Sequence, residues 1–501
     1  MTKVIFKGIG IDLIGTALLI IVGLLVVPIY LNFLTADAYG FWLSVSALVG
    51  FLGILDIGTD QYLTTIVANS KIFESSNMEE NLFLIVIIKA ITVVLIIFFG
   101  CALYFTLIFF IKKNTILTSA ENWVFFISVF NLCLTVMFNT IPTILTAKHN
   151  YSIVNGLVSA SGILASICGA ILLSSGLGII SLPLSISIFL IIQYLFFYFI
   201  LTKNYPNVKL KITIFNKAIF IDIIKYGFSF HLVKCVYGIF RIQYIIFLSG
   251  IFLGPAFAAK LTITNRLPST VGSIAMKIAS PFFPSFAELF AIQDKNSIKK
   301  IFFKLNKVLI RFALFAVITL YCVNEIFIDL WVGSALFGGK AVELWLLLYI
   351  LIYISMGAFG VVVFASKKFE MWPYWLIAEV IVTIILSVIL MEFYGLAGVV
   401  ASLTLGALVS QLYLFNIVKK QLDFKMRELL DGMLGYVLLP TITTLAGAFL
   451  LKNVLSTSNW LMLLLVLFWL TFLQLASREL FLIMQHKEKY FFDRLIKAFV
   501  P

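Results

Sequence analysis

Charged residues are scarce in this sequence, and their scarcity excludes most classes of protein. Of 501 residues only 12% are Asp, Glu, Lys or Arg, whereas 62% are hydrophobic, and the mean hydropathy is +1.11. Soluble globular domains carry roughly 25% charged residues, which keep their surfaces in water. The chain therefore cannot be a soluble protein, and we expect the lipid bilayer to be its solvent.

Cysteine, histidine and nucleotide-binding motifs are also rare or missing. The sequence has three histidines, and His149 and His231 have no ligand constellation around them, so we predict no metal site. It lacks the G-x-x-x-x-G-K-[ST] phosphate loop, of which Gly338-Gly339-Lys340 is only a fragment, so we expect neither an ATP-driven pump nor a cofactor. The five cysteines have no C-x-x-C spacing and predict no disulfide: Cys101, Cys133, Cys168, Cys235 and Cys322.

Long apolar runs occupy most of the chain. Each has about 20 residues or more, which is enough to cross a hydrocarbon core of roughly 30 Å as an α-helix. We predict an all-α polytopic membrane protein with about fourteen transmembrane helices. Their approximate ranges are 9–34, 39–68, 82–111, 123–147, 153–175, 179–201, 221–249, 253–284, 308–328, 342–365, 372–391, 396–418, 430–451 and 460–484.

The net charge of +13 is distributed as in a membrane protein and not as in a nucleic-acid-binding protein. Most Lys and Arg residues fall on alternate loops, above all on 203–225 and 295–307, and the other loops are short and poor in cations. Loops rich in Lys and Arg stay in the cytoplasm. We therefore predict that both termini are cytoplasmic and that nucleic acid is not a partner.

Two matching segments indicate an internal repeat. The segment FLTADAYGFWLSVSAL begins at Phe33 and FLGPAFAAKLTITNRL begins at Phe252, an offset of about 219 residues. Six helices separate the copies, so the repeat is parallel, with its axis along the membrane normal. We predict a lobe of six helices over 1–202, a cytoplasmic linker over 203–220 and a second lobe over 221–420. Residues 421–501 then add helices 13 and 14 and a cytoplasmic tail.

The motifs around both copies resemble those of bacterial polysaccharide flippases. The first stretch runs from Val27-Pro28-Ile29-Tyr30 through Ala38-Tyr39-Gly40-Phe41-Trp42 to Leu55-Asp56-Ile57-Gly58. The second includes Leu253-Gly254-Pro255-Ala256, Asn265-Arg266-Leu267 and Pro281-Phe282-Phe283-Pro284-Ser285. Both are similar to the Wzx-type O-antigen and repeat-unit translocases of the multidrug/oligosaccharidyl-lipid/polysaccharide (MOP) exporter superfamily.

The resemblance implies a V-shaped, two-lobed transporter with alternating access. Its substrate would be an undecaprenyl-pyrophosphate-linked oligosaccharide, moved across the bacterial cytoplasmic membrane within lipopolysaccharide or other surface polysaccharide biosynthesis. Membrane lipids, and the polymerase and chain-length proteins of the same pathway, are the partners that it implies.

Cations within the second lobe are the candidate substrate-binding residues. An ionisable side chain at the centre of the membrane costs about 2.5 kcal/mol or more, so its presence requires a reason. Arg241 and Arg266 fall at similar predicted depth on consecutive antiparallel helices, where two guanidinium groups suit a pyrophosphate. Lys234 precedes Arg241 by seven residues on the same helix face, and Lys260 replaces Phe41 of the first copy. Lys260 and Lys277 also fit as interfacial residues whose amines reach the headgroups.

Buried acidic residues are the candidates for ion coupling or for structural ion pairs. Asp56 and Asp60 are four residues apart, so we expect both carboxylates on one face of helix 2. Lys89 lies at the predicted depth of Asp60 on the next helix, which predicts an ion pair, while titration of a carboxylate is the alternative. Glu379 in helix 11 raises the same two possibilities, and Asp12 fits an interfacial position.

Two prolines are hinge candidates. Pro28 and Pro268 each remove a helical hydrogen bond, which favours a bend or a hinge between lobes.

A drug or cation antiporter of the same superfamily should have acidic cavity residues, which the excess of cations in the second lobe disfavours. A membrane-embedded polysaccharide polymerase or glycosyltransferase would need a larger external loop than this chain has. We expect a transporter coupled to an ion gradient, and not an enzyme.

Overall fold

The computed structural model is built from α-helices, and no β-strand occurs among the residues that it describes. These are 2–68, 77–111, 118–206, 241–366, 372–431, 439–451 and 459–484, together with 208, 211, 215–225 and 227. Contacts divide the chain into two compact units, Met1–Ala259 and Lys260–Pro501, hereafter the first and the second unit. The prediction of an all-α protein is confirmed, whereas the lobe boundaries at 202 and 221 stay a prediction.

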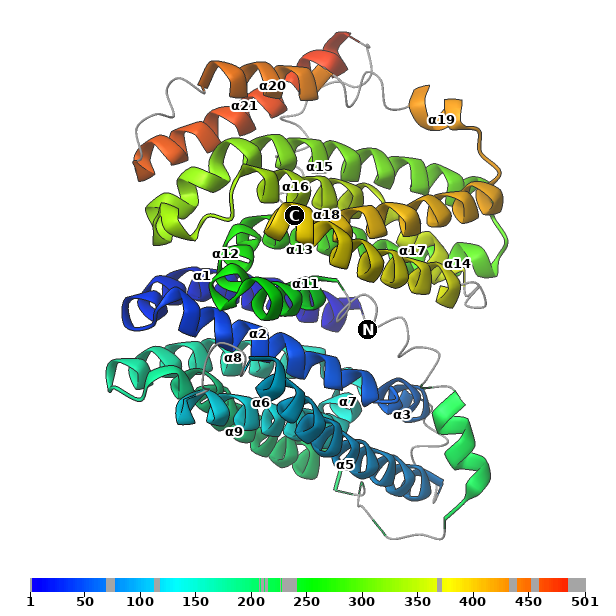
Figure 1. Cartoon of the computed structure of the whole chain (residues 1–501). Helices are drawn as coiled ribbons and strands as arrows, with labels where there is room; N and C mark the ends of the chain where they lie inside the picture. Colours follow the sequence, from blue (N-terminus) through cyan, green and yellow to red (C-terminus); the bar gives the residue numbers. More distant parts are fainter. Residues whose placement is uncertain are drawn as a thin grey trace. The chain divides into compact units, whose positions relative to one another are not determined.

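The first unit is a set of long helices that lie side by side (Figure 1). They are α1 (Thr2–Phe33), α2 (Ala36–Leu52), α3 (Thr59–Ala68), α5 (Asn77–Ile111), α6 (Ser119–Phe138), α7 (Thr140–Ala147), α8 (Tyr151–Ser174), α9 (Ser181–Asn204) and α11 (Ile242–Leu248). Short helical turns occur at Gly53–Leu55, Gly178–Ile180 and Ser249–Leu253.

Small residues bring α1 and α8 close together. A Cβ added at Gly15 would meet Ser159 Oγ at 2.5 Å, and one at Gly162 would meet Leu19 at 3.0 Å. Helices in lipid associate through close van der Waals packing, which small residues permit. The sequence of α8 therefore suits contact with a second helix.

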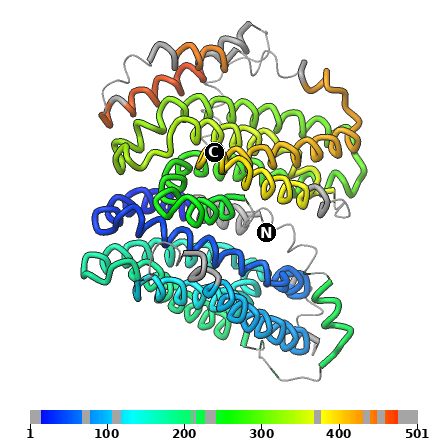
Figure 2. Tube along the Cα trace, in the orientation of Figure 1, coloured from blue at the N-terminus to red at the C-terminus, as the bar shows by residue number. Residues whose placement is uncertain are grey.

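The second unit is organised around α15, which is its longest uninterrupted helix. The elements are α12 (Pro255–Thr264, which begins in the first unit), α13 (Arg266–Ala279), α14 (Phe282–Ala291), α15 (Lys295–Val332), α16 (Lys340–Ser355), α17 (Gly357–Ala365), α18 (Trp372–Leu422), α19 (Met426–Asp431), α20 (Leu439–Leu451) and α21 (Trp460–Met484). Helices α16 and α18 pack in series beside α15, and the pair α20 and α21, orange to red in Figure 2, also contacts it.

Length and composition identify the membrane-spanning helices. Eight helices are long and apolar enough to cross a bilayer, and the bent pair of α16 and α17 would be a ninth span within the described residues. Many of their apolar side chains point outwards; Leu195 is 62% exposed and Phe199 is also 62% exposed. Such exposure suits contact with acyl chains, and the predicted total of fourteen helices stays a prediction.

Several helices that the sequence predicts as continuous are broken, and two of them carry candidate site residues. The expected helix over 39–68 ends at Leu52, and Asp56 and Gly58 form a turn in which Asp56 Oδ1 accepts from the Gly58 amide at 3.3 Å. Gly58 has a positive φ of 75°, which glycine adopts at little cost. The prediction that Asp56 and Asp60 share a helix face is therefore wrong, because Asp56 precedes the helix α3 that carries Asp60.

The second broken helix is the one expected over 253–284. It divides into α12, α13 and α14, and the first break falls at Asn265. Pro268 has no amide hydrogen to donate to the carbonyl of Thr264, four residues earlier, and its ring crowds that carbonyl. Proline chemistry thus explains why α12 ends at Thr264. Pro28, in contrast, lies inside the uninterrupted α1.

Candidate functional site

A buried charged triad joins α3, α5 and α7 in the first unit. Lys89 Nζ donates to Asp60 Oδ1 at 2.6 Å, and Asn139 Nδ2 donates to Asp60 Oδ2 at 2.5 Å. Lys89 is only 1% exposed, and the Asp60 side chain is 14% exposed. Both carboxylate oxygens therefore accept from a fixed donor, and the structure brings together two residues that the sequence predicted as a pair.

The triad is enclosed by apolar side chains of the same helices. Leu63, Ile85, Leu145 and Phe197 belong to the buried cluster that these helices share with α9. A charged pair so placed is weakly screened, and removing one member leaves the other uncompensated. This arrangement suits a structural pair that fixes three helices.

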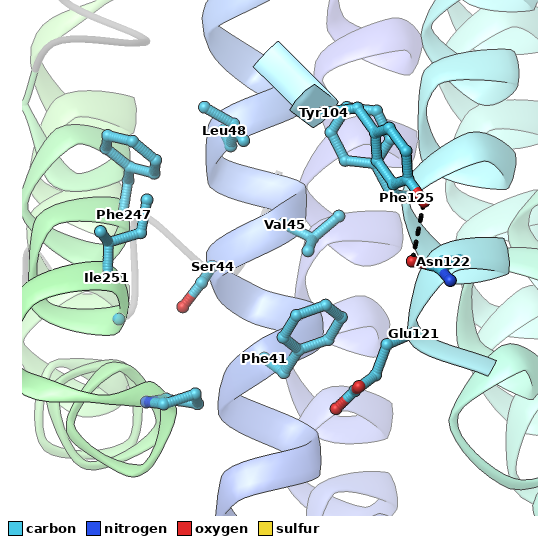
Figure 3. A pocket seen from close by; sticks show the side chains of 12 residues that line it. Phe41, Ser44, Val45, Leu48, Tyr104, Glu121, Asn122, Phe125, Phe247 and Ile251 are labelled. Carbon is cyan, nitrogen blue, oxygen red and sulfur yellow. Dashed lines mark hydrogen bonds between the residues drawn. The ribbon is translucent and has the colours of Figure 1, made fainter. Parts of the chain in front are cut away.

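A cavity opens in the first unit between α2, the start of α6, and α11 with the turn that follows it (Figure 3). Its walls are mainly apolar and include Phe41, Leu48 and Phe247. The hydroxyl of Tyr104 donates to Asn122 Oδ1 at 3.0 Å at one side of it, the dashed line in Figure 3. The cavity therefore has few polar groups, and it offers mostly hydrocarbon contact.

The two copies of the repeat meet beside this cavity. The carboxylate of Asp37, in the first copy, accepts from the amide of Ala256, in the second, at 3.2 Å, and the two positions are 219 residues apart. A Cβ added at Gly40 would meet Pro255 O at 1.8 Å, and one at Gly250 would meet Ser44 Oγ at 1.8 Å. The Asp37 carboxylate, from α2, thus contacts the first turn of α12, where a negative charge is favourable. Equivalent positions of the repeat are therefore in direct contact.

The predicted basic residues are divided between the units. Arg241 lies directly before α11 in the first unit and is buried, with 4% of its surface exposed. Lys260 and Arg266 lie in the second unit, on α12 and at the start of α13, and both are half-buried. Lys234 falls outside the described residues. Lys277 lies in the last turn of α13 and is also half-buried.

Arg266 is positioned by the break that Pro268 causes. Its Nε is buried, and its guanidinium makes no hydrogen bond or ion pair with the described residues. The free carbonyl of Thr264 instead accepts from Asn324 Nδ2 of α15 at 3.1 Å, while Thr264 Oγ1 accepts from the Gly338 amide at 2.8 Å. The break is therefore stabilised by its neighbours, and it leaves a guanidinium group available beside it.

The predicted acidic residues differ in their surroundings. Glu379 is 2% exposed within α18, next to Thr383, whose buried hydroxyl has no hydrogen-bond partner in the described part of the chain. Asp56 is half-buried in its turn. Asp12 lies in α1, and its side chain is outside the described residues. Ion coupling by any of these carboxylates stays a prediction.

Two buried charged residues were not selected from the sequence. Glu343 is fully buried in the first turn of α16 and pairs with Lys340 at 2.9 Å. Arg311 of α15 is 8% exposed, and its guanidinium donates to the backbone carbonyl of Gln474 in α21 at 2.8 Å. The spacing Lys340-x-x-Glu343 was a signal for the first, because residues three apart share a helix face. Arg311 stood in an apolar run and carried the signal of any intramembrane charge.

The charged and amide groups described above suit the binding of an anion or a small cation. No group of three or more His, Cys, Asp or Glu side chains that could hold a metal occurs among the described residues. The groups available for binding are the Arg266 guanidinium and several buried amides and carboxylates. The first unit adds an apolar cavity.

No protein-family model matches the sequence, and no curated protein matches it. Solved structures do match its fold. Lipid II flippase MurJ, in an inward closed conformation, aligns with 95% of this chain and 99% of its own at a TM-score of 0.72 and 16% identity. A eukaryotic MATE transporter aligns with 84% of this chain and 97% of its own, with a TM-score of 0.58 and 13% identity.

A second MATE comparison gives a similar result. An inward-facing multidrug resistance MATE family transporter of the MOP superfamily aligns with 79% of this chain and 94% of its own, at a TM-score of 0.57 and 15% identity. MurJ and the MATE proteins belong to the MOP superfamily, so the predicted MOP-like fold is confirmed. These neighbours are membrane transporters and not enzymes.

Proposed function

We propose that this protein is a flippase for a lipid-linked oligosaccharide. The observation that carries the proposal is the alignment with lipid II flippase MurJ, which extends over 95% of the chain and includes nearly all of that protein. The two MATE transporters compared above align with 84% and 79% of the chain. The substrate proposed from the sequence, an undecaprenyl-pyrophosphate-linked repeat unit, is itself a lipid-linked saccharide.

The basic residues support an anionic headgroup. Arg266 has a buried Nε without a hydrogen-bond partner among the described residues, and a guanidinium group binds phosphate oxygens through paired hydrogen bonds. Lys260, in the same unit, is a further candidate for this headgroup, and Arg241 and Lys234 stay candidates from the sequence. The lipid tail would remain in the bilayer, against the apolar surfaces of the helices. The bacterial cytoplasmic membrane, with both termini inside, and a polymerase partner belong to this proposal.

A multidrug or cation antiporter is the second candidate. The buried Glu379, at 2% exposure, favours it, because a carboxylate in the membrane attracts a cationic substrate or a coupling ion. The MATE neighbours provide a fold for that activity. A membrane-embedded polymerase or glycosyltransferase has no comparable support.

A reconstituted transport assay tests the proposal. The full-length protein would be placed in liposomes with a fluorescent undecaprenyl-pyrophosphate oligosaccharide, and a membrane-impermeant quencher would measure how much reaches the outer leaflet. We expect translocation by the unmodified protein and about a 10- to 100-fold lower rate for Arg266→Ala, because hydrogen bonds to charged groups contribute roughly 1.5–3 kcal/mol.

Arg427→Ala is the matched control, because Arg427 is exposed on α19, and it should leave the rate unchanged. Absence of translocation by folded protein, together with uptake of an organic cation, would replace the flippase by the antiporter. Elongation of the saccharide would instead show an enzyme.

A further inference from the structure

The first turn of α16 holds a buried carboxylate whose bonding is incomplete. Glu343 is 0% exposed, and its Oε2 accepts from Lys340 Nζ at 2.9 Å. Its other oxygen, Oε1, is buried without a hydrogen-bond partner within the described residues. A buried acceptor without a donor costs free energy, so the site as it stands lacks one hydrogen.

A second buried oxygen next to it also lacks a donor. Asn324 of α15 is 0% exposed and lies close to the Glu343 carboxyl. One hydrogen of its Nδ2 is donated to the carbonyl of Thr264 at 3.1 Å, which the Pro268 break has freed. Its Oδ1 has no partner in the described part of the chain. Both neighbouring side chains thus have a buried oxygen for which the described residues provide no donor.

The charge of the cluster is also unbalanced. The ammonium of Lys340 serves two carboxylates, since it lies 2.8 Å from Glu325 Oε2 as well as 2.9 Å from Glu343. It also lies over the rings of Tyr321 and Phe337, at 5.0 and 5.6 Å from their centroids. The three charged groups sum to one negative charge, and one of the two carboxylates, Glu343, is not exposed to water.

The titratable groups around Glu343 come from two helices. They are Lys340 on α16 itself, and Glu325 and the Cys322 thiol on α15. Helices α13 and α18 also pack against α16. Neither brings a charged side chain into an ion pair with Glu343 in the part of the chain that the structure describes.

We propose that Glu343 is a proton-binding site, filled and emptied during transport, with Asn324 Oδ1 as the acceptor for the bound proton. A proton on Oε1 supplies the missing donor and removes the excess negative charge in one step. A metal cation fits less well, because hard cations such as Ca²⁺ collect roughly six or more oxygen ligands, and the ammonium of Lys340 would repel one. The role in transport rests on the proposed flippase function, whereas proton binding does not.

Infrared difference spectroscopy tests proton binding directly. Purified full-length protein in lipid would be titrated from acid to alkaline pH while the C=O stretch of protonated carboxyl groups is followed. We expect a band that disappears as the pH rises. The band should be absent from the Glu343→Gln protein and present in the Glu379→Gln protein. Glu325→Gln is the matched control, because it alters a 48% exposed carboxylate on the same lysine and should also retain the band.

Three outcomes would overturn the proposal. A spectrum without any band assignable to Glu343 would mean that the carboxylate stays ionised, with a buried water as the missing donor. Stabilisation by sodium but not by choline chloride, lost in Glu343→Gln, would make the site a metal site. A folded Glu343→Gln protein that still responds to a pH gradient in the translocation assay would remove Glu343 from coupling.

The two proposals can fail separately. The infrared band does not depend on the substrate, so proton binding can hold even where no lipid-linked oligosaccharide is moved. Translocation without the band would retain the flippase and reject the proton site. Size-exclusion profiles of each variant in detergent show whether it has folded, so a lost band reflects the carboxyl group and not the fold.

Discussion

The first and second units differ in how they bond their buried polar side chains. In the first unit, the only buried side-chain atoms without a partner among the described residues are hydroxyls, those of Thr59, Thr140 and Ser181. In the second unit, charged and amide groups are also left without partners: Asn265, Arg266, Asn306, Asn324, Glu343, Gln411 and Gln421. A hydroxyl can rotate towards a neighbour, whereas an amide or a charge has fixed requirements.

The difference assigns separate tasks to the units. The triad of Asp60, Lys89 and Asn139 in the first unit is complete, which suits a scaffold. Arg266 and Glu343 in the second unit are incomplete, and incomplete buried polar groups are costly unless a partner binds them. Substrate and proton are the partners that we propose. The sequence indicated an asymmetry of charge, because its second repeat is the more basic.

The largest expected effect comes from breaking the triad. Lys89→Met leaves Asp60 charged and buried, which should lower the free energy of unfolding by about 3–5 kcal/mol. Arg266→Met should cost far less, since its guanidinium makes no hydrogen bond or ion pair with the described residues. Unfolding of the purified proteins in mild detergent measures both.

Lys211→Met is the control for Lys89→Met. Lys211 pairs with Glu79 at 2.7 Å, but its side chain is 60% exposed, so its loss should cost less than about 1 kcal/mol. Equal losses for Lys89→Met and Arg266→Met would remove the distinction between a scaffold unit and a binding unit.

A smaller effect is expected from the close packing in the first unit. Gly40→Ala places a methyl group 1.8 Å from Pro255 O, so helix and turn must separate, at a cost of about 1–3 kcal/mol. Gly50 lies in the same helix α2 with nothing within 4 Å, and Gly50→Ala should stabilise by about 0.5–1 kcal/mol through helix propensity. Melting temperatures of the two variants would have opposite shifts. A Gly40→Ala protein as stable as the original would show that the repeat contact is loose.

Much of the fold could be predicted from hydropathy, since helices in lipid must be apolar and about 20 residues long. The turn at Asp56 and Gly58 was not predicted, because no proline marks it and the segment 39–68 as a whole is apolar enough to be taken as one helix. The break at Asn265 had a signal in Pro268, which the sequence predicted as a bend. Whether a proline separates two helices completely depends on a partner for the carbonyl that it frees, here Asn324, and that is a tertiary contact.

The candidate site was partly predictable. Asp60 and Lys89 were matched through equal depth on adjacent helices, which follows from helix geometry alone. Glu343 was missed because a charge at a helix start normally lies at the membrane interface, exposed to water. Its complete burial depends on α15 and on the loop before α16, and no periodicity in α16 itself indicates it.

The smallest effect tests the bond that links the Pro268 break to Asn324. Asn324→Leu removes the donor to the carbonyl of Thr264, so in the natural background that carbonyl loses its partner. In a Pro268→Ala background, the new amide of residue 268 can donate to the same carbonyl, as in an unbroken helix. Asn324→Leu should therefore cost about 0.5–1.5 kcal/mol less in that background, the contribution of one hydrogen bond.

A double-mutant cycle on unfolding free energies measures this coupling. Thr319→Val is the control within α15, because Thr319 is 7% exposed and its hydroxyl has no partner among the described residues, so its effect should add to that of Pro268→Ala. If the effect of Asn324→Leu also adds to that of Pro268→Ala, the Asn324 amide does not stabilise the break. The orphaned Asn324 Oδ1 would then be a consequence of loose packing, and the contrast between the two units would rest on Arg266 and Glu343 alone.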